Sequence, residues 1–425
     1  MFIFTKNTLL MTSKYLFLFI ALFLVQFSFS QAAEEVEPPY YIKTITFKGN
    51  TNESELPILR LGERLQLEFD VLNNEEADFY YVIEHYDYDW TPSRLIKSRY
   101  LQGFDDQRIV NYENSFNTYQ LYSHYSLQIP NNQTQLLVSG NYMMKIFDEN
   151  GELMFSRKFM VYEDVATVGV AIKRSRDVRF IHQKQSVDIS IGSLNLNFVN
   201  PKQTVNVAII QNNNLKTAIT GLKPQYTLGN ELIYKYDTET SFWAGNEYLF
   251  FENKNVRGAN VGVRNFDLKD VFHNYLYTDI IRANRPYTYN PDINGNFLIT
   301  ALDVENLDIE ADYTVIHFSL QHPELLDKSI HVYGNFNNYA ITEDTQMTFN
   351  PDSGVYETRL LLKQGFYNYK YVMVDNDNTV DEGAISGNFD QTENNYKVLV
   401  YYRDLGGLYD KIIGVGEASS TLITN

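Results

Sequence analysis

A strict alternation of apolar and polar residues is the feature that most constrains the fold of this chain. Residues 65–71 read Leu-Gln-Leu-Glu-Phe-Asp-Val. A period of two places successive side chains on opposite faces of a β-strand. The pattern therefore predicts a strand whose apolar face lies in a core and whose polar face, with Glu68 and Asp70, is in water.

The same alternation recurs along the chain, and no window sustains an apolar 3.6-residue period beyond about three turns. Aromatic residues make up 15% of the sequence, and they favour the pleated surface of a sheet over a helix. We predict an all-β protein of tandem sandwich domains. The expected strands lie around residues 142–146, 155–161, 187–191, 205–209, 356–362, 367–373 and 396–400.

Turn signals and composition divide the chain into expected domains. Asn150-Gly151 is typical of a tight hairpin and precedes the strand that closes the first domain. A chain of 425 residues is long enough for two to four domains at roughly 150 residues each. We predict three β-sandwich domains and a fraying tail, with these boundaries: N-terminal domain 36–165, middle domain 166–306, C-terminal domain 307–404 and tail 405–425.

The first thirty residues have the pattern of an export signal. Lys6 and Lys14 precede an apolar run over 15–27, and small residues follow at Ser28 and Ser30. The run is shorter than the roughly 20 residues of a membrane-spanning helix, so an uncleaved anchor is the weaker interpretation. We predict a cleaved signal peptide over 1–30 and a periplasmic protein without direct membrane insertion.

Charge and cysteine content exclude several functions. The formal net charge is −18, which repels nucleic-acid phosphates and anionic lipid surfaces at long range. The sequence has no cysteine, so disulfides, thiolate catalysis and cysteine-ligated clusters are excluded. No nucleic-acid partner is expected.

Candidate catalytic patterns are weak. The chain has no Gly-x-Ser-x-Gly elbow, no His-Glu-x-x-His and no phosphate-binding glycine loop. Asp87 and Asp89 are two apart on an expected strand, so their carboxylates could share a face about 6 to 7 Å apart, near the spacing of a glycosidase pair. The alternative is a solvated strand end, because Thr-Pro-Ser follows at 91–93. We favour this alternative and expect no catalytic residue.

Metal and cofactor sites are likewise not expected. The histidines show no i, i+4 pair, and scattered histidines in strands usually satisfy local hydrogen bonds; they lie at positions 85, 124, 182, 273, 317, 322 and 331. Residues 375–381 resemble a calcium loop, but Val380 occupies the position that requires glycine and Ser386 the position that requires glutamate. A hairpin turn is the preferred interpretation.

Longer strings carry the informative resemblance. Residues 79–93 read Phe-Tyr-Tyr-Val-Ile-Glu-His-Tyr-Asp-Tyr-Asp-Trp-Thr-Pro-Ser, and further strings follow at 100–104, 114–118, 122–125, 242–247, 392–396 and 400–403. Their order and spacing over nearly the whole mature chain resemble the plug proteins of the type IX secretion system. One departure is Tyr86, where that family often has a small residue or cysteine; it affects packing more than role.

The resemblance implies a non-enzymatic subunit. Members of that family dock on the periplasmic mouth of an outer-membrane translocon barrel and seal it while no substrate passes. Because Trp, Tyr and Arg dominate interface hot spots, we expect the barrel contacts among aromatic and basic residues of the first domain: Trp90, Arg94, Tyr100, Phe104, Tyr119 and Tyr125. The alternative for each is a place in the core of the first sandwich.

The C-terminal domain read by itself suggests another function. Residues 332–339, a turn at 352–354 and residues 362–371 resemble early-set sandwich modules related to glycogen-binding domains. Such modules stack a sugar on exposed aromatic rings. Tyr339 is the first candidate contact, but the loop 376–379, where the second would lie, has no aromatic residue. An exported carbohydrate-binding protein is therefore the second hypothesis.

Overall fold

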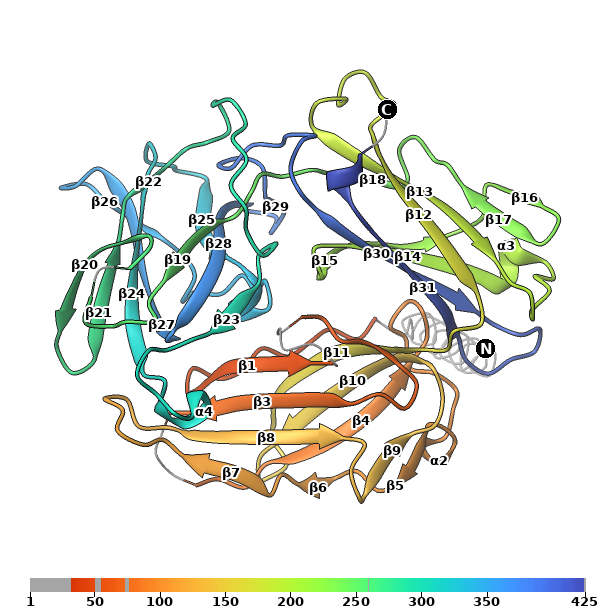
Figure 1. Ribbon diagram of the computed structural model, residues 1–425, viewed down its shortest axis with the longest axis horizontal. Helices are drawn as coiled ribbons and strands as arrows, with labels where there is room; N and C mark the ends of the chain where they lie inside the picture. Colours follow the sequence, from red (N-terminus) through yellow and green to blue (C-terminus); the bar gives the residue numbers. More distant parts are fainter. Residues whose placement is uncertain (1–31, 50–54, 73–75, 259, 424–425) are drawn as a thin grey trace, which may run out of the picture.

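The computed structural model describes residues 32–49, 55–72, 76–258 and 260–423, so the expected signal peptide over 1–30 lies outside the described residues. The described chain consists of β-strands with a few short helical turns, arranged around three large hydrophobic cores (Figure 1). The predicted all-β sandwich fold is confirmed. No helix among these residues has the length and apolar character needed to cross a bilayer.

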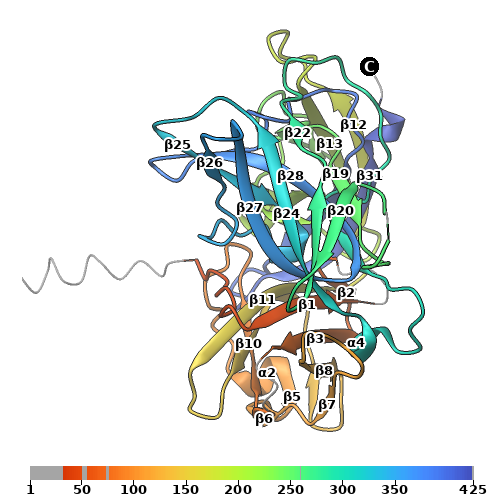
Figure 2. The same ribbon diagram turned by 90° about the vertical axis from the view of Figure 1, so that its left-hand side faces the viewer.

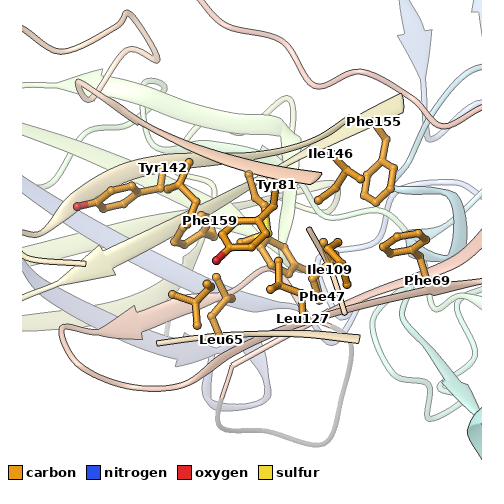
Figure 3. Close-up of a cluster of buried hydrophobic side chains, with 14 of the residues drawn as sticks. Phe47, Leu65, Phe69, Tyr81, Ile109, Leu127, Tyr142, Ile146, Phe155 and Phe159 are labelled. Atoms are coloured by element: carbon orange, nitrogen blue, oxygen red, sulfur yellow. The ribbon is translucent and has the colours of Figure 1, made fainter. Parts of the chain in front are cut away.

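The first core is a sandwich formed by the N-terminal part of the chain. One sheet contains, in spatial order, β1 (Ile42–Lys48), β3 (Leu65–Val71), β8 (Ser123–Ile129) and β7 (Asn111–Asn114). The facing strands are β2 (Ile58–Arg60), β11 (Leu153–Tyr162), β10 (Gly140–Phe147), β4 (Tyr80–Tyr86) and β6 (Gln107–Arg108). Aromatic and aliphatic side chains from both sheets fill the space between them (Figure 3). Beside the sandwich lie α2 (Lys97–Tyr100), β5 (Leu101–Gly103) and β9 (Thr134–Leu136).

The second core shares a sheet with the first. Tyr162 on β11 pairs in parallel with Ile412 on β31, and the nine-stranded sheet continues from there. The added strands are β31 (Lys411–Ser419), β30 (Asn395–Tyr402), β14 (Val205–Gln211) and β15 (Asn214–Leu222). The opposing sheet contains β12 (Thr167–Arg174), β13 (Lys184–Gly192), β17 (Glu231–Tyr234), β16 (Tyr226–Leu228) and β18 (Ser241–Trp243). Two short helices flank this core: α3 (Pro201–Thr204) and η2 (Ser420–Leu422).

The third core lies between two further sheets. The first sheet contains β19 (Leu249–Glu252), β28 (Gly365–Asp375), β23 (Phe297–Ile299), β25 (Lys328–Tyr333) and β29 (Val380–Asp381). The second contains β20 (Val263–Leu268), β21 (Phe272–Leu276), β24 (Tyr313–Gln321), β27 (Val355–Lys363), β26 (Thr348–Asn350) and β22 (Asp279–Ile280). The segment α4 (Leu307–Glu310) leads into β24, and η1 (Asn335–Asn337) follows β25.

The cores group the chain differently from the expected boundaries. Strands β19 to β23 precede residue 306 but pack in the third core. Strand β30 precedes residue 404 but packs in the second core, with buried Tyr396, Val398 and Val400. The segment expected to fray as a tail contains β31, whose Ile412 and Ile413 are buried. The second core is thus formed by two separate parts of the chain, and the third core is formed by the residues between them. Domains that each consist of one continuous segment cannot describe this arrangement.

The three cores are arranged around a common centre. Figures 1 and 2 both show the N-terminal sandwich below the other two, with the second and third cores above it. Side-chain and strand contacts join each core to both of the others: Asp70–Lys363, the pairing of β11 with β31, and Asn214–Tyr333.

Candidate functional site

The first and third cores meet across a buried ion pair. The side chains of Asp70 on β3 and Lys363 on β27 are 1% and 2% exposed, and Nζ lies 2.8 Å from Oδ2. The same carboxylate accepts hydrogen bonds of 2.7 Å from the Tyr313 hydroxyl and from Nδ1 of His124. Burial raises the pKa of Asp70, but Lys363 and His124 together bring it below its ordinary value. Asp70 is thus ionised and paired at neutral pH.

This contact corrects the expectation that the polar face of residues 65–71 is in water. Glu68 and Asp70 are 7% and 1% exposed because the third core covers that face. The alternation itself is as predicted, and β3 spans the expected residues. The polar face therefore forms an interface inside the protein rather than a solvated surface.

The first and second cores are joined by a second polar cluster, in which Asp87 and Asp410 are buried and Arg403 is one-third exposed. The Arg403 guanidinium lies 2.6 Å from a carboxylate oxygen of Asp87 and 2.7 Å from one of Asp410. Nearby, the Tyr401 hydroxyl donates a 2.8 Å hydrogen bond to Asn141. Together with the shared nine-stranded sheet, these contacts fix the two cores relative to each other.

Asp87 and Asp89 are not arranged as a catalytic pair. Asp87 is buried against Arg403 and accepts a hydrogen bond from the backbone N–H of Asp410. Asp89 is exposed and accepts hydrogen bonds from the backbone N–H and the hydroxyl of Thr91. One carboxylate joins two cores and the other stabilises a turn.

A cavity of about 800 Å³ lies where the three cores meet. Strand β1 of the first core, β27 of the third and Leu215 on β15 of the second all line it. Its wall carries charged side chains of both signs: Glu35, Glu37, Lys43, Glu55, Arg157, Lys158, Glu343, Asp344 and Arg359. The mixed charge indicates no single class of ligand.

Three of the six predicted contact residues are wholly or partly buried. Tyr125 is fully buried, stacks on Phe69 at 5.2 Å between ring centroids and donates a hydrogen bond to the carbonyl of Ala77. Tyr100 is 6% exposed. Trp90 is half-buried under the ammonium of Lys158, 4.6 Å from the ring centroid. Tyr125 and Tyr100 therefore stabilise the first core rather than present a surface to a partner.

The other three residues are exposed. Phe104 is 71% exposed in the turn between β5 and β6, and Arg94 is exposed ahead of α2. Tyr119 is 45% exposed, but its ring packs edge-on against Phe272 of the third core, 5.2 Å between centroids. Phe104 and Arg94 are thus the predicted residues that are free for an external contact.

Sequence reasoning missed further exposed apolar side chains close to Phe104 in the chain. Ile96, Val110 and Phe116 are 68%, 70% and 67% exposed. They flank α2, β6 and β7, which lie with β5 along one outer edge of the first sandwich in Figures 1 and 2. We name the segment 94–116 the outer edge. Large apolar residues inside polar turns were the signal that could have identified it.

The alternative sites suggested by the sequence have structural roles. Residues 375–379 form the turn between β28 and β29, closed by a 3.0 Å hydrogen bond from the N–H of Asp375 to the carbonyl of Thr379. Tyr339 is 4% exposed and packs against Tyr333, 5.1 Å between centroids. Its ring is therefore not accessible for stacking on a sugar.

The geometry defines a multi-core β-sandwich protein whose cores are joined by ionic contacts and a shared sheet. Residues 42–163, the first core, match the family model described as type 9 secretion system plug protein 1st domain. The first domain of the chain therefore resembles the first domain of plug proteins of this secretion system.

Solved structures extend the comparison beyond the first domain. A hypothetical protein from Parabacteroides merdae ATCC 43184 is 32% identical, with a TM-score of 0.87 over 92% of this chain and 100% of that one. The whole three-core arrangement is therefore shared with that protein. Dimeric latent PorU from Porphyromonas gingivalis aligns at 8% identity, covering 89% of this chain and 34% of that one; its TM-score of 0.14 supports no argument. No curated protein matches the chain.

Proposed function

We propose that this chain is a non-enzymatic plug subunit, which docks on the periplasmic opening of the outer-membrane translocon barrel of the type IX secretion system and seals it. The observation that carries the proposal is the match of residues 42–163 to the first domain of plug proteins. The same match and the expected export signal support a periplasmic location at the inner face of the outer membrane.

The contacts between the cores support this function. A subunit that closes a wide pore has to keep its shape against a folded cargo. Ion pairs with buried partners resist separation, because breaking one leaves an uncompensated charge. The pair Asp70–Lys363 joins the first core to the third, and Arg403 with Asp87 joins the second to the first. The nine-stranded sheet, in which β11 pairs with β31, also joins the first core to the second.

The outer edge supports a contact with another protein. Exposed aromatic and aliphatic side chains ringed by polar residues are typical of protein interfaces, and a few buried anchors carry most of the binding energy. Phe104 has the largest exposed ring there, at 71%. We therefore assign Phe104 and Arg94 to the barrel contact, with Ile96, Val110 and Phe116 as further exposed apolar residues of the same segment.

The test is affinity purification of the tagged chain from outer membranes in mild detergent. We expect a very large barrel protein to be recovered with it. Phe104→Glu should reduce this recovery at least about tenfold, because a charge would replace a buried apolar anchor. Leu326→Glu is the matched control, since Leu326 is 90% exposed on a loop of the third core and should retain the partner.

Deletion of the gene provides a second readout. If the chain seals a pore, its loss admits bulky antibiotics into cells whose barrel is otherwise open, and the Phe104→Glu variant should behave like the deletion. Recovery of the chain without any barrel partner, together with unchanged antibiotic resistance in the deletion strain, would contradict the proposed function.

A further inference from the structure

Three potential metal ligands converge where the first and third cores meet. Glu68 on β3, His124 on β8 and Asp308 on α4 each offer a ligand atom, and these atoms lie within 4.8 Å of one another. Nε2 of His124 is 4.0 Å from a carboxylate oxygen of Asp308. Strands β3 and β8 pair with Asp70 opposite His124, so Glu68, Asp70 and His124 share the sheet face that meets α4.

The imidazole of His124 is oriented for a ligand. Its Nδ1 donates a 2.7 Å hydrogen bond to Asp70, a carboxylate itself held by Lys363 and Tyr313. In the neutral ring this leaves the lone pair on Nε2. The His124 side chain is only 12% exposed, and its Nε2 is buried without a hydrogen-bond partner. In proteins, a histidine that binds a metal through one ring nitrogen often donates its other N–H to a carboxylate, which fixes the orientation of the ring.

Glu68 retains one position for a ligand. It accepts hydrogen bonds from Thr46 and Lys48 on one oxygen and from Gln66 on the other. An ionised carboxylate has about four lone-pair positions, so one stays open after these three contacts.

We propose that Glu68, His124 and Asp308 form a zinc-binding site between the first and third cores. One imidazole with two carboxylates is a ligand set suited to Zn²⁺, whereas Ca²⁺ and Mg²⁺ prefer oxygen ligands alone. Bonds of about 2.0 to 2.2 Å place two tetrahedral ligand atoms roughly 3.4 Å apart. Asp308 therefore has to approach Nε2 of His124, now 4.0 Å away, by about 0.6 Å, and a pair of ligand atoms at the 4.8 Å limit has to close by about 1.4 Å. The Asp308 side chain is 57% exposed and free to move.

The exposure of Asp308 also gives the site access to solvent and a fourth position for water. Because Asp308 lies on α4, immediately before β24, a bound ion would fasten the start of the third core to the first sandwich. The metal would then add to the contact made by Asp70 and Lys363, and binding would stabilise the folded protein by mass action. This inference does not depend on docking to the barrel.

The test is calorimetric titration of the purified protein, carrying no histidine tag, with ZnCl₂ and separately with MgCl₂. We expect one zinc ion per chain, no Mg²⁺ binding at the same concentrations, and a higher melting temperature with zinc. His124→Ala and Asp308→Asn should each weaken zinc binding at least about tenfold. Asp308→Asn is the safer variant, because the carboxylate is exposed and its loss leaves the core packing unchanged.

Two matched controls locate the site. Asp303→Asn changes an exposed aspartate of the same connecting segment, and His182→Ala removes a histidine that is 79% exposed on the second core. Both should bind zinc like the unmodified protein. Three outcomes would each overturn the proposal: no saturable zinc binding, a zinc affinity in His124→Ala and Asp308→Asn that is unchanged from the unmodified protein, or binding of Mg²⁺ as tight as that of zinc.

Discussion

At the scale of single residues, the charged side chains of β3 decide how the first and third cores are joined. Asp70 and Glu68 point away from the core of their own sandwich, as their alternation with apolar residues predicts. What lies beyond that face is another core, so the pair Asp70–Lys363 is almost completely buried. Removing one partner of a buried ion pair lowers the free energy of unfolding far more than replacing both partners does.

We expect Lys363→Met to lower the free energy of unfolding by about 3 kcal/mol, because Asp70 is left as a buried charge without its ammonium partner. The double variant Asp70→Asn/Lys363→Met should be more stable than the single one. Urea unfolding measures both. As a control, Lys328→Met removes an exposed ion pair with Asp375 and should cost less than about 1 kcal/mol. Equal costs for the Lys363 and Lys328 variants would contradict the role given to this contact.

The same scale shows where residue type misleads. Tyrosine is enriched both in sandwich cores and at protein interfaces, because it combines a large apolar ring with a polar tip. Tyr125 and Tyr100 are buried, whereas Phe104 is exposed. Tyr125 alternates with polar residues on the buried face of β8, whereas Phe104 lies in a polar turn, so the local pattern separates these two residues where residue type does not.

At the scale of elements, β31 is a strand within the segment 405–425 that the sequence predicts as a tail. Gly414 and Gly416 interrupt its apolar pattern, and glycine weakens a strand. Both glycines are required by the packing of β12: a Cβ at Gly416 would lie 2.7 Å from Val168 and 2.8 Å from Val170, and one at Gly414 would lie 2.6 Å from the carbonyl of Ala166. The two sheets of the second core approach each other there more closely than a side chain allows.

We expect Gly416→Val to lower the free energy of unfolding by about 1 to 3 kcal/mol through overpacking against β12. Gly192→Val is the matched control, because Gly192 also lies in a strand, β13, and a Cβ there would meet no atom within 4 Å. It should change stability by less than about 0.5 kcal/mol. Chemical denaturation of both variants gives the comparison, and similar losses in the two would exclude close packing as the reason for the glycine.

At the scale of the whole molecule, the three cores form one body. The nine-stranded sheet passes from the first core into the second, and buried polar contacts join the third core to both: Asp70–Lys363 to the first, and a 3.0 Å hydrogen bond from Asn214 to the Tyr333 hydroxyl to the second. A closed arrangement cannot open at one contact without straining the others. This is the property that a plug requires.

We therefore expect a single cooperative unfolding transition in scanning calorimetry. Arg403→Ala should lower the melting temperature by about 5 °C and separate the transition into two, because Asp87 and Asp410 lose their shared cation at the junction of two cores. Arg60→Ala, which removes an exposed pair with Asp164, serves as the control and should leave the melting profile unchanged. Two transitions in the unmodified protein would show that the cores unfold independently.

The sequence by itself determined the all-β class and the position of most strands, because a period of two and a short turn are local properties of the chain. Only the tertiary structure decided which strands share a core. Strand β30 pairs with β14, nearly two hundred residues earlier, and β3 has its polar face covered by a core formed far along the chain. Local alternation specifies which residues of a strand face opposite ways; what covers each face depends on long-range packing.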